Sequence, residues 1–421
     1  MKGSQKIHIV LENENHPLLS IISAEYEPKI GVQLINSWDF NGNDHDYGNC
    51  KYYFRILLNS VFFSEFINNY CCSRCDFEEN DVSLFGIVFL NPKSNDKNYH
   101  SIGLLTKMHE IPHERSLNKL IFQRIHFIAV KYLNKIMDME DDLDFANLLK
   151  KVAMDCIGLF QAGIPIERIK LLNSGDASFY NLCLTSHLQS MMTTIIEATS
   201  EEECSSLFSL LSHFLLPEQR KLSCKKILKK PIPGLYLQCV KPQSNLFPVI
   251  LRFDRPWTYI VTSKKKVINF TNIIEQKQIF NIYSSNVFYS LEKNTLEQKQ
   301  LCAKLMKTYH DHLILPCEWV KDLISSIMNK EELAELICKQ KFFELIQRGL
   351  ILSDLIKEST KMIKLPFLQT NQIDSIMKLM DIKDKIELRV LCSISEIFNE
   401  GSFNQLFSGR NETIRKMISS M

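Results

Sequence analysis

Glycine is scarce in this chain, at 13 of 421 residues. Loops that cradle phosphate groups are rich in glycine, because a residue without Cβ lets backbone N–H groups approach the ligand. The strings typical of such loops, G-x-x-x-x-G-K-[ST] and G-x-G-x-x-G, do not occur, and G-x-S-x-G is missing as well. We therefore predict a chain without bound nucleotide, without a cofactor and without catalytic residues.

Excess charge and long apolar runs are also missing. The 50 Lys and Arg against 48 Asp and Glu give a net charge of +2, which argues against a nucleic-acid partner. The longest apolar run, Leu84–Leu90, is far below the ~20 residues of a membrane-spanning helix. No signal peptide is apparent in the first residues, so we expect a cytoplasmic protein.

The 13 cysteines follow no regular spacing, and four of them stand within apolar patterns: Cys156, Cys183, Cys239 and Cys392. In a reducing compartment, such residues behave as small buried hydrophobes.

Two strings resemble metal sites. Cys71–Cys75 contains one C-x-x-C, which Cys50 or His45 could complete, but a second closely spaced ligand pair is missing. A strand that ends before the turn at 78–81 explains these cysteines better.

His109–His113 matches H-E-x-x-H, which needs both histidines on one continuous helix. Pro112 disfavours a helical residue before it, so we expect a strand-to-helix connector and no metal site.

The first third reads as strands followed by a helix. Short runs rich in Ile, Val, Leu and Phe alternate with turn residues and predict an antiparallel meander, at 6–11, 18–24, 31–38, 54–66, 82–90 and 101–105. Apolar residues then recur at helical spacing from Leu117 to Ile136. This order fits a longin-like domain over residues 1–140.

The middle third predicts an α/β region and the last third is helical. The expected middle elements are helices at 145–162 and 179–188, a strand at 192–196, a helix opened by the capping box of Ser200 and Glu203 and ended by Pro217, and strands at 234–240, 248–253 and 259–262. The helices expected after about residue 290 lie at 296–309, 318–328, 331–345, 374–380 and 388–398. The predicted fold class is therefore α+β with several domains, as expected for a chain too long for one core.

Four strings in the middle third stand at the ends of these expected elements. They are Ser-His-Leu-Gln at 186–189, Leu-Pro-Glu-Gln-Arg-Lys at 216–221, Gly-Leu-Tyr-Leu-Gln at 234–238 and Pro-Trp-Thr at 256–258. Together they resemble the DENN-type family of the ALS- and frontotemporal-dementia-linked chromosome-nine open-reading-frame-seventy-two protein. The chain departs from that family at 26–31, where the family's Trp is missing, so any partner contact of that aromatic is not carried over.

The resemblance implies a longin-like domain (1–140), a central α/β DENN domain (145–290) and a helical region (291–421). It also implies action on a small Rab- or Arf-type GTPase at the surface of endosomal, autophagic or lysosomal membranes. The family works in a complex with a second longin-DENN protein and a WD40-repeat protein, and that complex is implicated in GTPase activation, autophagy and lysosomal signalling.

Two mechanisms remain open under this resemblance. In the first, the chain is a guanine-nucleotide exchange factor that binds the switch regions in a conformation with low nucleotide affinity. In the second, it is a non-catalytic scaffold in a complex that activates GTP hydrolysis. An arginine finger raises that rate about 10³–10⁵-fold. Arg55 and Arg74 are expected in strands and Arg115 and Arg124 on a helix, so a partner would supply the finger.

Five residues are candidates for the partner surface: Arg115 and Arg124 on the helix after Pro112, and Arg220, Arg255 and Trp257 in loops of the middle third. The alternative for Trp257 is that its indole packs the corner of the sheet.

Two lysine runs, at 225–230 and 264–266, could assist membrane contact at roughly 1 kcal/mol per basic residue. Exposed loops between strands would show the same pattern for solubility alone, and we favour that explanation.

Overall fold

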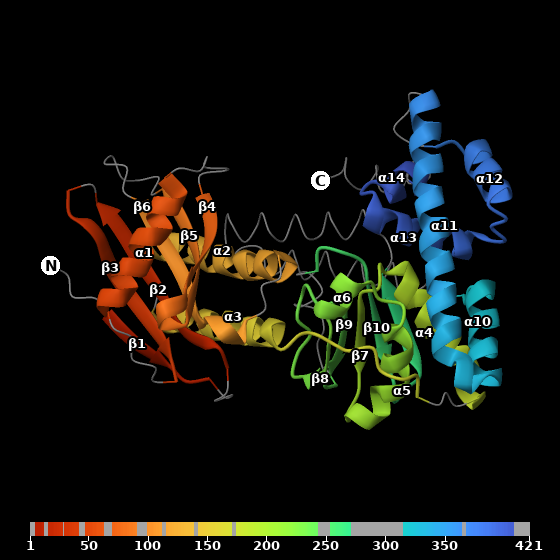
Figure 1. The fold of residues 1–421 in the computed structure, drawn as a ribbon, viewed down its shortest axis with the longest axis horizontal. Coiled ribbons are helices and arrows are strands. Elements are labelled where there is room, and N and C mark those ends of the chain that lie inside the picture. Colours follow the sequence, from red (N-terminus) through yellow and green to blue (C-terminus); the bar gives the residue numbers. More distant parts are fainter. Residues whose placement is uncertain are drawn as a thin grey trace. The chain divides into compact units, whose positions relative to one another are not determined.

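The computed structural model describes residues 5–11, 16–27, 29–41, 47–62, 70–90, 99–111, 115–138, 142–170, 174–242, 253–270, 315–363 and 368–407. The chain divides into two compact units, residues 1–161 and 162–421, each taken here by itself (Figure 1). The division into three domains stays a prediction. Within the described ranges, no helix is long and apolar enough to cross a membrane.

The first unit contains a six-stranded sheet in the order β1-β3-β2-β6-β5-β4. Its strands are β1 (Gln5–Ile9), β2 (Leu18–Glu27), β3 (Gly31–Phe40), β4 (Tyr70–Phe77), β5 (Val82–Leu90) and β6 (Tyr99–Lys107). The neighbours run antiparallel, except that β1 runs parallel to β3. The predicted antiparallel strands are confirmed from β2 to β6, including the strand that carries Cys71–Cys75. The order is not a simple meander, because β1 runs parallel to β3 and β2 pairs with β6.

Helices cover both faces of this sheet: α1 (Tyr47–Phe62) on one, and α2 (Arg115–Asp138) and α3 (Asp142–Phe160) on the other (Figure 1). Alternation along β5 explains this arrangement, because successive side chains point to opposite faces. Leu84 and Val88 belong to the core beneath α1, whereas the Phe85 ring contacts Phe122 of α2 at 5.8 Å between centroids.

The strand predicted at 54–66 is wrong, because residues 47–62 form α1. Five side chains of this helix are buried against the sheet at spacings of three and four residues: Cys50, Tyr53, Phe54, Leu57 and Leu58. This spacing forms one face of a helix. The aromatic residues suggested a strand, and burial of the helical face decided the outcome.

The second unit contains a five-stranded sheet in the order β11-β10-β7-β9-β8. Its strands are β7 (Thr194–Glu197), β8 (Cys224–Leu228), β9 (Leu237–Val240), β10 (Trp257–Val261) and β11 (Lys266–Phe270). Strands β7 to β10 run parallel and β11 runs antiparallel at the edge. The strand expected at 248–253 lies almost wholly outside the described residues.

Three helices accompany this sheet: α4 (Ala177–Gln189), α5 (Glu201–Ser212) and α6 (Pro217–Lys221). Ser200 caps α5, since its side chain accepts a hydrogen bond from Glu203 N at 3.3 Å. The Glu203 carboxylate accepts from Thr199 N at 2.7 Å. The predicted capping box therefore forms, except that the glutamate binds the N–H of Thr199 and not that of the capping residue Ser200. Helix α5 ends at Ser212, earlier than the predicted end at Pro217, and Pro217 instead opens α6 at the first helical position.

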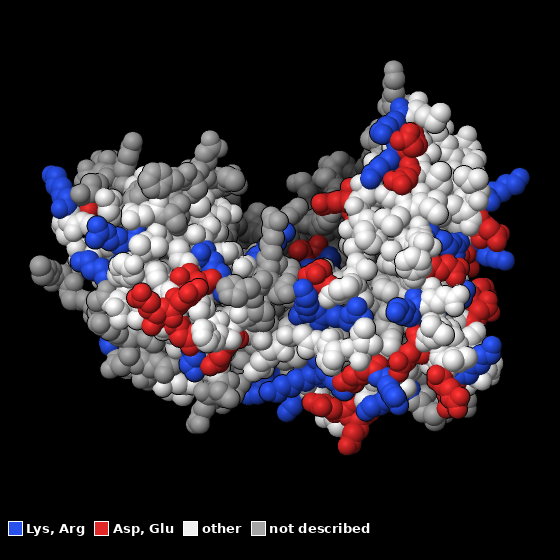
Figure 2. All heavy atoms as spheres, viewed as in Figure 1, with Lys and Arg blue, Asp and Glu red and all other residues white. Residues whose placement is uncertain are grey.

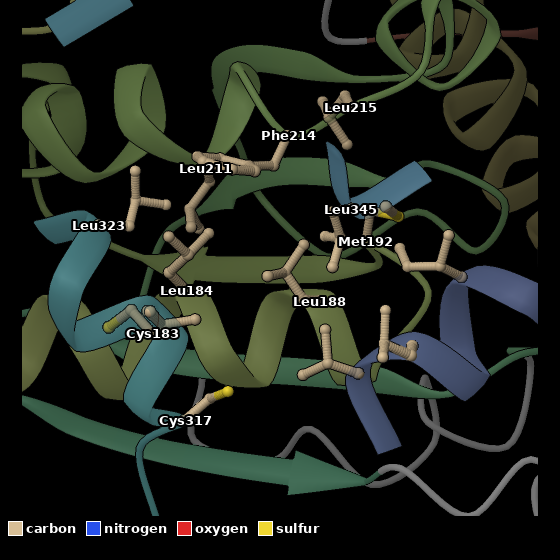
Figure 3. Close-up of a cluster of buried hydrophobic side chains, with 14 of the residues drawn as sticks. Cys183, Leu184, Leu188, Met192, Leu211, Phe214, Leu215, Cys317, Leu323 and Leu345 are labelled. Atoms are coloured by element: carbon tan, nitrogen blue, oxygen red, sulfur yellow. The ribbon is translucent and has the colours of Figure 1, made fainter. Parts of the chain in front are cut away.

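The C-terminal part is helical, as predicted: α10 (Glu318–Asn329), α11 (Ala334–Ile363), α12 (Thr370–Leu379), α13 (Lys385–Phe398) and α14 (Ser402–Phe407). The helix expected at 296–309 lies outside the described residues. Helices α10 and α13 pack against α4, which places α4 in the middle of the unit. Figure 3 shows Leu184 and Leu188 of α4 among side chains from α5, α10 and α11.

Candidate partner-binding surface

The parallel strands of the second unit bring four loops to one edge of the sheet. Because β7, β8, β9 and β10 run in the same direction, the segments that precede them share the edge at their amino ends. We call these segments the amino-edge loops: residues 190–193, 217–223, 232–236 and 253–256. The second of them contains helix α6, so Arg220 lies on a short helix and not in a loop as predicted. Three of the predicted surface residues, Arg220, Arg255 and Trp257, lie in or directly after them.

Hydrogen bonds join these loops to one another. Tyr236 donates its N–H to Leu222 O at 2.8 Å, and Tyr236 O accepts from Thr194 N at 2.6 Å. Thr258 N donates to Thr193 O at 2.9 Å, which links the start of β10 to the loop before β7. The four loops are therefore held by the sheet as one surface.

Arg255 lies across the ring of Tyr236, with Cζ 4.2 Å from the ring centroid, and its Nε donates to Asp254 Oδ1 at 3.2 Å. Contact of a guanidinium with an aromatic face is favourable and fixes the side chain. Arg220 is half-buried on α6, and burial lowers the pKa of its guanidinium. A partly desolvated cation of this kind favours an anionic group on a partner.

The exposed members of these loops carry both signs of charge. Glu218 and Lys221 are exposed on either side of Arg220, with Lys221 Nζ 3.5 Å from Glu218 Oε1. Figure 2 shows basic and acidic side chains interspersed over the face of the molecule that it draws. This mixed charge suits a protein surface as partner better than a polyanion.

Trp257 does not extend this surface. Its indole is 2% exposed at the start of β10 and packs with Ile195, Val240, Phe253 and Tyr259. This place agrees with the alternative in which Trp257 packs the corner of the sheet.

The two remaining candidates lie in the first unit, on α2. The side chain of Arg115 is outside the described residues. Arg124 Nε lies 3.8 Å from Asp155 Oδ2 of α3, and the arginine side chain is 11% exposed. This environment holds Arg124 between two helices of its own unit.

The two arginines that were expected on strands, Arg55 and Arg74, lie in different environments. Arg74 is on β4, donates to Asp76 Oδ1 at 2.8 Å and lies 4.9 Å above the Phe85 ring. Arg55, by contrast, is exposed on α1, because the strand predicted there is a helix. Of the arginines before residue 140 whose side chains the structure describes, Arg55 is the exposed one.

The motif residues of the middle third form a buried polar network. Thr258 Oγ1 donates to Ser186 O at 2.9 Å, and Ser393 Oγ of α13 donates to Gln189 O at 2.8 Å. His187 Nδ1 lies 2.8 Å from Thr194 Oγ1 of β7. Residues 186–189 therefore join α4 to the sheet and to the C-terminal helices.

The other strings are also structural. Gln238 binds both backbone groups of Ile232, accepting from N at 2.7 Å and donating to O at 3.1 Å. Gly234 between them has φ of 104°, a conformation that favours glycine. The Gly-Leu-Tyr-Leu-Gln string thus fixes one amino-edge loop and places Tyr236 beneath Arg255.

Burial lowers the pKa of His187 to about 3, while the Phe214 carbonyl acts in the opposite direction. The imidazole is therefore neutral at physiological pH. Its contact with Thr194 helps to hold α4 against β7.

The two strings that resembled metal sites lie in different elements: Cys71–Cys75 in β4, and the start of His109–His113 in the turn after β6. His109 follows β6 in a short 3-10 turn, and its Nδ1 lies 2.9 Å from Asp81 Oδ1. His113 is outside the described residues. Within the ranges that the structure describes, no three His, Cys, Asp or Glu side chains gather as a metal site would need.

Tyr236 was missed by the sequence reasoning, although it belongs to a quoted string. The available signal was its position between the glycine turn and β9, where a side chain reaches the edge of the sheet. Arg55 was missed as an exposed residue because its segment was assigned to a strand.

These features define a mixed α+β protein with two units and a helical C-terminal region, whose candidate site is a surface of loops. A family model described as the C9orf72-like protein family matches residues 52–276, more than half of the chain. The chain therefore belongs to the C9orf72-like family, as the resemblance of its middle third indicated. A comparison with curated proteins gave no match.

Proposed function

We propose that this chain is a DENN-type regulator of small Rab-like GTPases that acts by surface binding. The observation that carries the proposal is membership of the C9orf72-like family over residues 52–276, a range that contains all the amino-edge loops. In this proposal, the first unit is the longin-like domain and the sheet of the second unit is the centre of the DENN domain. The protein works at endosomal, autophagic or lysosomal membranes.

The proposed mechanism is exchange by differential binding. A surface that prefers the GTPase conformation with low nucleotide affinity accelerates nucleotide release without any proton transfer. The amino-edge loops suit this task because a rigid sheet holds Arg220, Lys221 and Arg255 in fixed positions. The buried hydrogen bonds of residues 186–189 and Gln238 keep these loops in place.

The test is release of a fluorescent GDP analogue from a panel of Rab and Arf GTPases, with the purified chain as catalyst. We expect acceleration for at least one GTPase and a loss of about 10-fold, or ~1.4 kcal/mol, on Arg220→Ala or Lys221→Glu. Lys339→Ala is the matched control, because Lys339 is an exposed basic residue of α11 in the same unit. Equal loss in the control, or no loss in either loop variant, refutes the role of the amino-edge loops.

The second candidate is a scaffold in a complex with another longin-DENN protein and a WD40-repeat protein. One observation bears on it: Arg74 and Arg124 are bound within their own unit, and Arg55 alone of the described three is exposed. GTP hydrolysis is then measured with the reconstituted complex. If the partner supplies the finger, Arg55→Ala keeps the hydrolysis rate, whereas a fall of about 10³-fold or more would place the finger on α1.

A further inference from the structure

Two cysteines far apart in the sequence bring their sulfur atoms together under the second sheet. Cys204 lies in the first turn of α5, and Cys239 lies in β9, the strand that α5 packs against. The Cys239 thiol donates to Cys204 Sγ at 3.3 Å, and both side chains are fully buried. A disulfide has an S–S bond of about 2.05 Å, so an approach of little more than one ångström would join them.

The two thiols differ in a way that suits a stepwise reaction. The hydrogen bond from Cys239 lowers the pKa of Cys204, against the effect of its burial, and the same bond raises the pKa of Cys239. Cys204 is therefore the sulfur that loses its proton first, and thiolate is the reactive form of cysteine. The amino end of α5 also favours a negative charge, whereas the carboxylates of Glu201 and Glu203 in the same turn raise the pKa of Cys204.

Access comes through the end of the helix. Glu201, Glu202 and Glu203, which precede Cys204 in the same turn, are exposed. Helix ends open locally at lower free-energy cost than helix interiors, and local opening of this turn would give a small oxidant a route to Cys204 without unfolding the unit. Cys392, in the middle of α13, has no such exposed turn beside it and is fully buried.

We propose that Cys204 and Cys239 form a redox modification site, a dithiol that hydrogen peroxide or another small hydroperoxide converts into a disulfide between α5 and β9. This inference is independent of the proposed action on GTPases.

The reaction has two steps. The Cys204 thiolate attacks a peroxide oxygen and the O–O bond breaks, which leaves a sulfenic acid on Cys204 and one water after proton transfer. The Cys239 sulfur then attacks the sulfenic sulfur, the S–O bond breaks and a second water leaves. Two thiols lose two electrons and two protons, and one hydrogen peroxide becomes two waters.

The experiment treats the full chain with hydrogen peroxide, stops the reaction with catalase, alkylates all remaining thiols in denaturant and maps the peptides by mass spectrometry. We expect a linked pair of peptides containing Cys204 and Cys239, formed faster than any oxidation of Cys392 and reversed by dithiothreitol. Cys204 and Cys239 recovered as separate alkylated peptides, while Cys71 or Cys72 is already oxidised, would overturn the proposal.

Two variants make the result specific. Cys239→Ser keeps a hydroxyl that can donate to Cys204 Sγ, so this variant is expected to leave a sulfenic acid on Cys204 that a dimedone probe labels. Cys392→Ser is the matched control that keeps the linked peptide. The wild-type map does not depend on either variant folding. An unlabelled Cys204 in a folded Cys239→Ser protein would contradict the assigned order of the two sulfurs.

Discussion

Acid should destabilise the second unit through His187. This imidazole is fully buried in α4, and burial lowers its pKa to about 3 in the folded chain. In the unfolded chain the pKa returns to about 6.5. Between these values the unfolded state binds a proton that the folded state does not, so stability falls as the pH falls. The contribution is fully present above about pH 6.5 and is lost progressively toward pH 3.

The size of this effect follows from the difference between the pH and the unfolded pKa. At pH 5.0 the pH lies about 1.5 units below the unfolded pKa, so protonation of His187 stabilises the unfolded state by ~2 kcal/mol. His187→Asn removes the titrating group and leaves an amide near the position of Nδ1, within reach of Thr194 Oγ1. The variant also leaves a small cavity, which costs about 1–3 kcal/mol at every pH.

The assay is urea unfolding at pH 7.5 and pH 5.0, followed by pulsed hydrogen exchange of peptides from α4 and β7. We expect the wild type to lose ~2 kcal/mol more than His187→Asn between the two pH values. Other half-buried or buried histidines with lowered pKa values titrate in both proteins and cancel in the comparison: His16, His100, His126 and His213. Exposed His109 gives the control variant. An identical pH dependence in wild type and His187→Asn would refute the reasoning.

Two further substitutions test the packing of each unit. Gly86→Ala places a Cβ 2.2 Å from Leu57 Cδ2 in the fully packed layer under α1, so we expect a loss of about 1–3 kcal/mol in urea unfolding of the first unit. Arg348→Met removes the partner of Glu387, whose carboxylate lies 2.6 Å from Arg348 Nη1 and joins α13 to α11. We expect a loss of about 3 kcal/mol in thermal or urea unfolding of the second unit, and a loss below 0.5 kcal/mol would show that the pair is well solvated.

The alternating strands and the long helices were predictable because their apolar spacing is regular. Pro112 and the apolar stripe from Leu117 predicted the helix observed as α2, and the capping residue Ser200 predicted the start of α5. Helix α1 shows where the same reasoning fails. Its aromatic residues favour a strand locally, whereas the face that holds Cys50, Phe54 and Leu57 is buried only as a helix. The local preference of a residue for helix or strand does not show which face of the segment will be buried in the folded protein.

The candidate surface was harder to predict than the fold. Arg220 and Arg255 are 35 positions apart, and only the parallel order of β7 to β10 brings their loops to one edge. The stacking of Arg255 on Tyr236 depends on the turn at Gly234. The sequence predicts a turn at this glycine, but it does not predict the direction in which the turn sends the chain. The burial of Trp257 depends on the register of β10 with β7, a pairing across more than sixty residues.

The strings that identify the family and the residues proposed to contact a GTPase are different sets. His187 and Gln238 are buried, and each holds a loop or helix in place through side-chain hydrogen bonds. A buried polar group without its partner costs about 1–3 kcal/mol, so these positions tolerate little change whatever the partner is. Exposed neighbours such as Lys221 carry no such constraint. In the proposed function, specificity for a particular GTPase therefore resides in the exposed positions of the amino-edge loops, on a framework that the buried strings keep fixed.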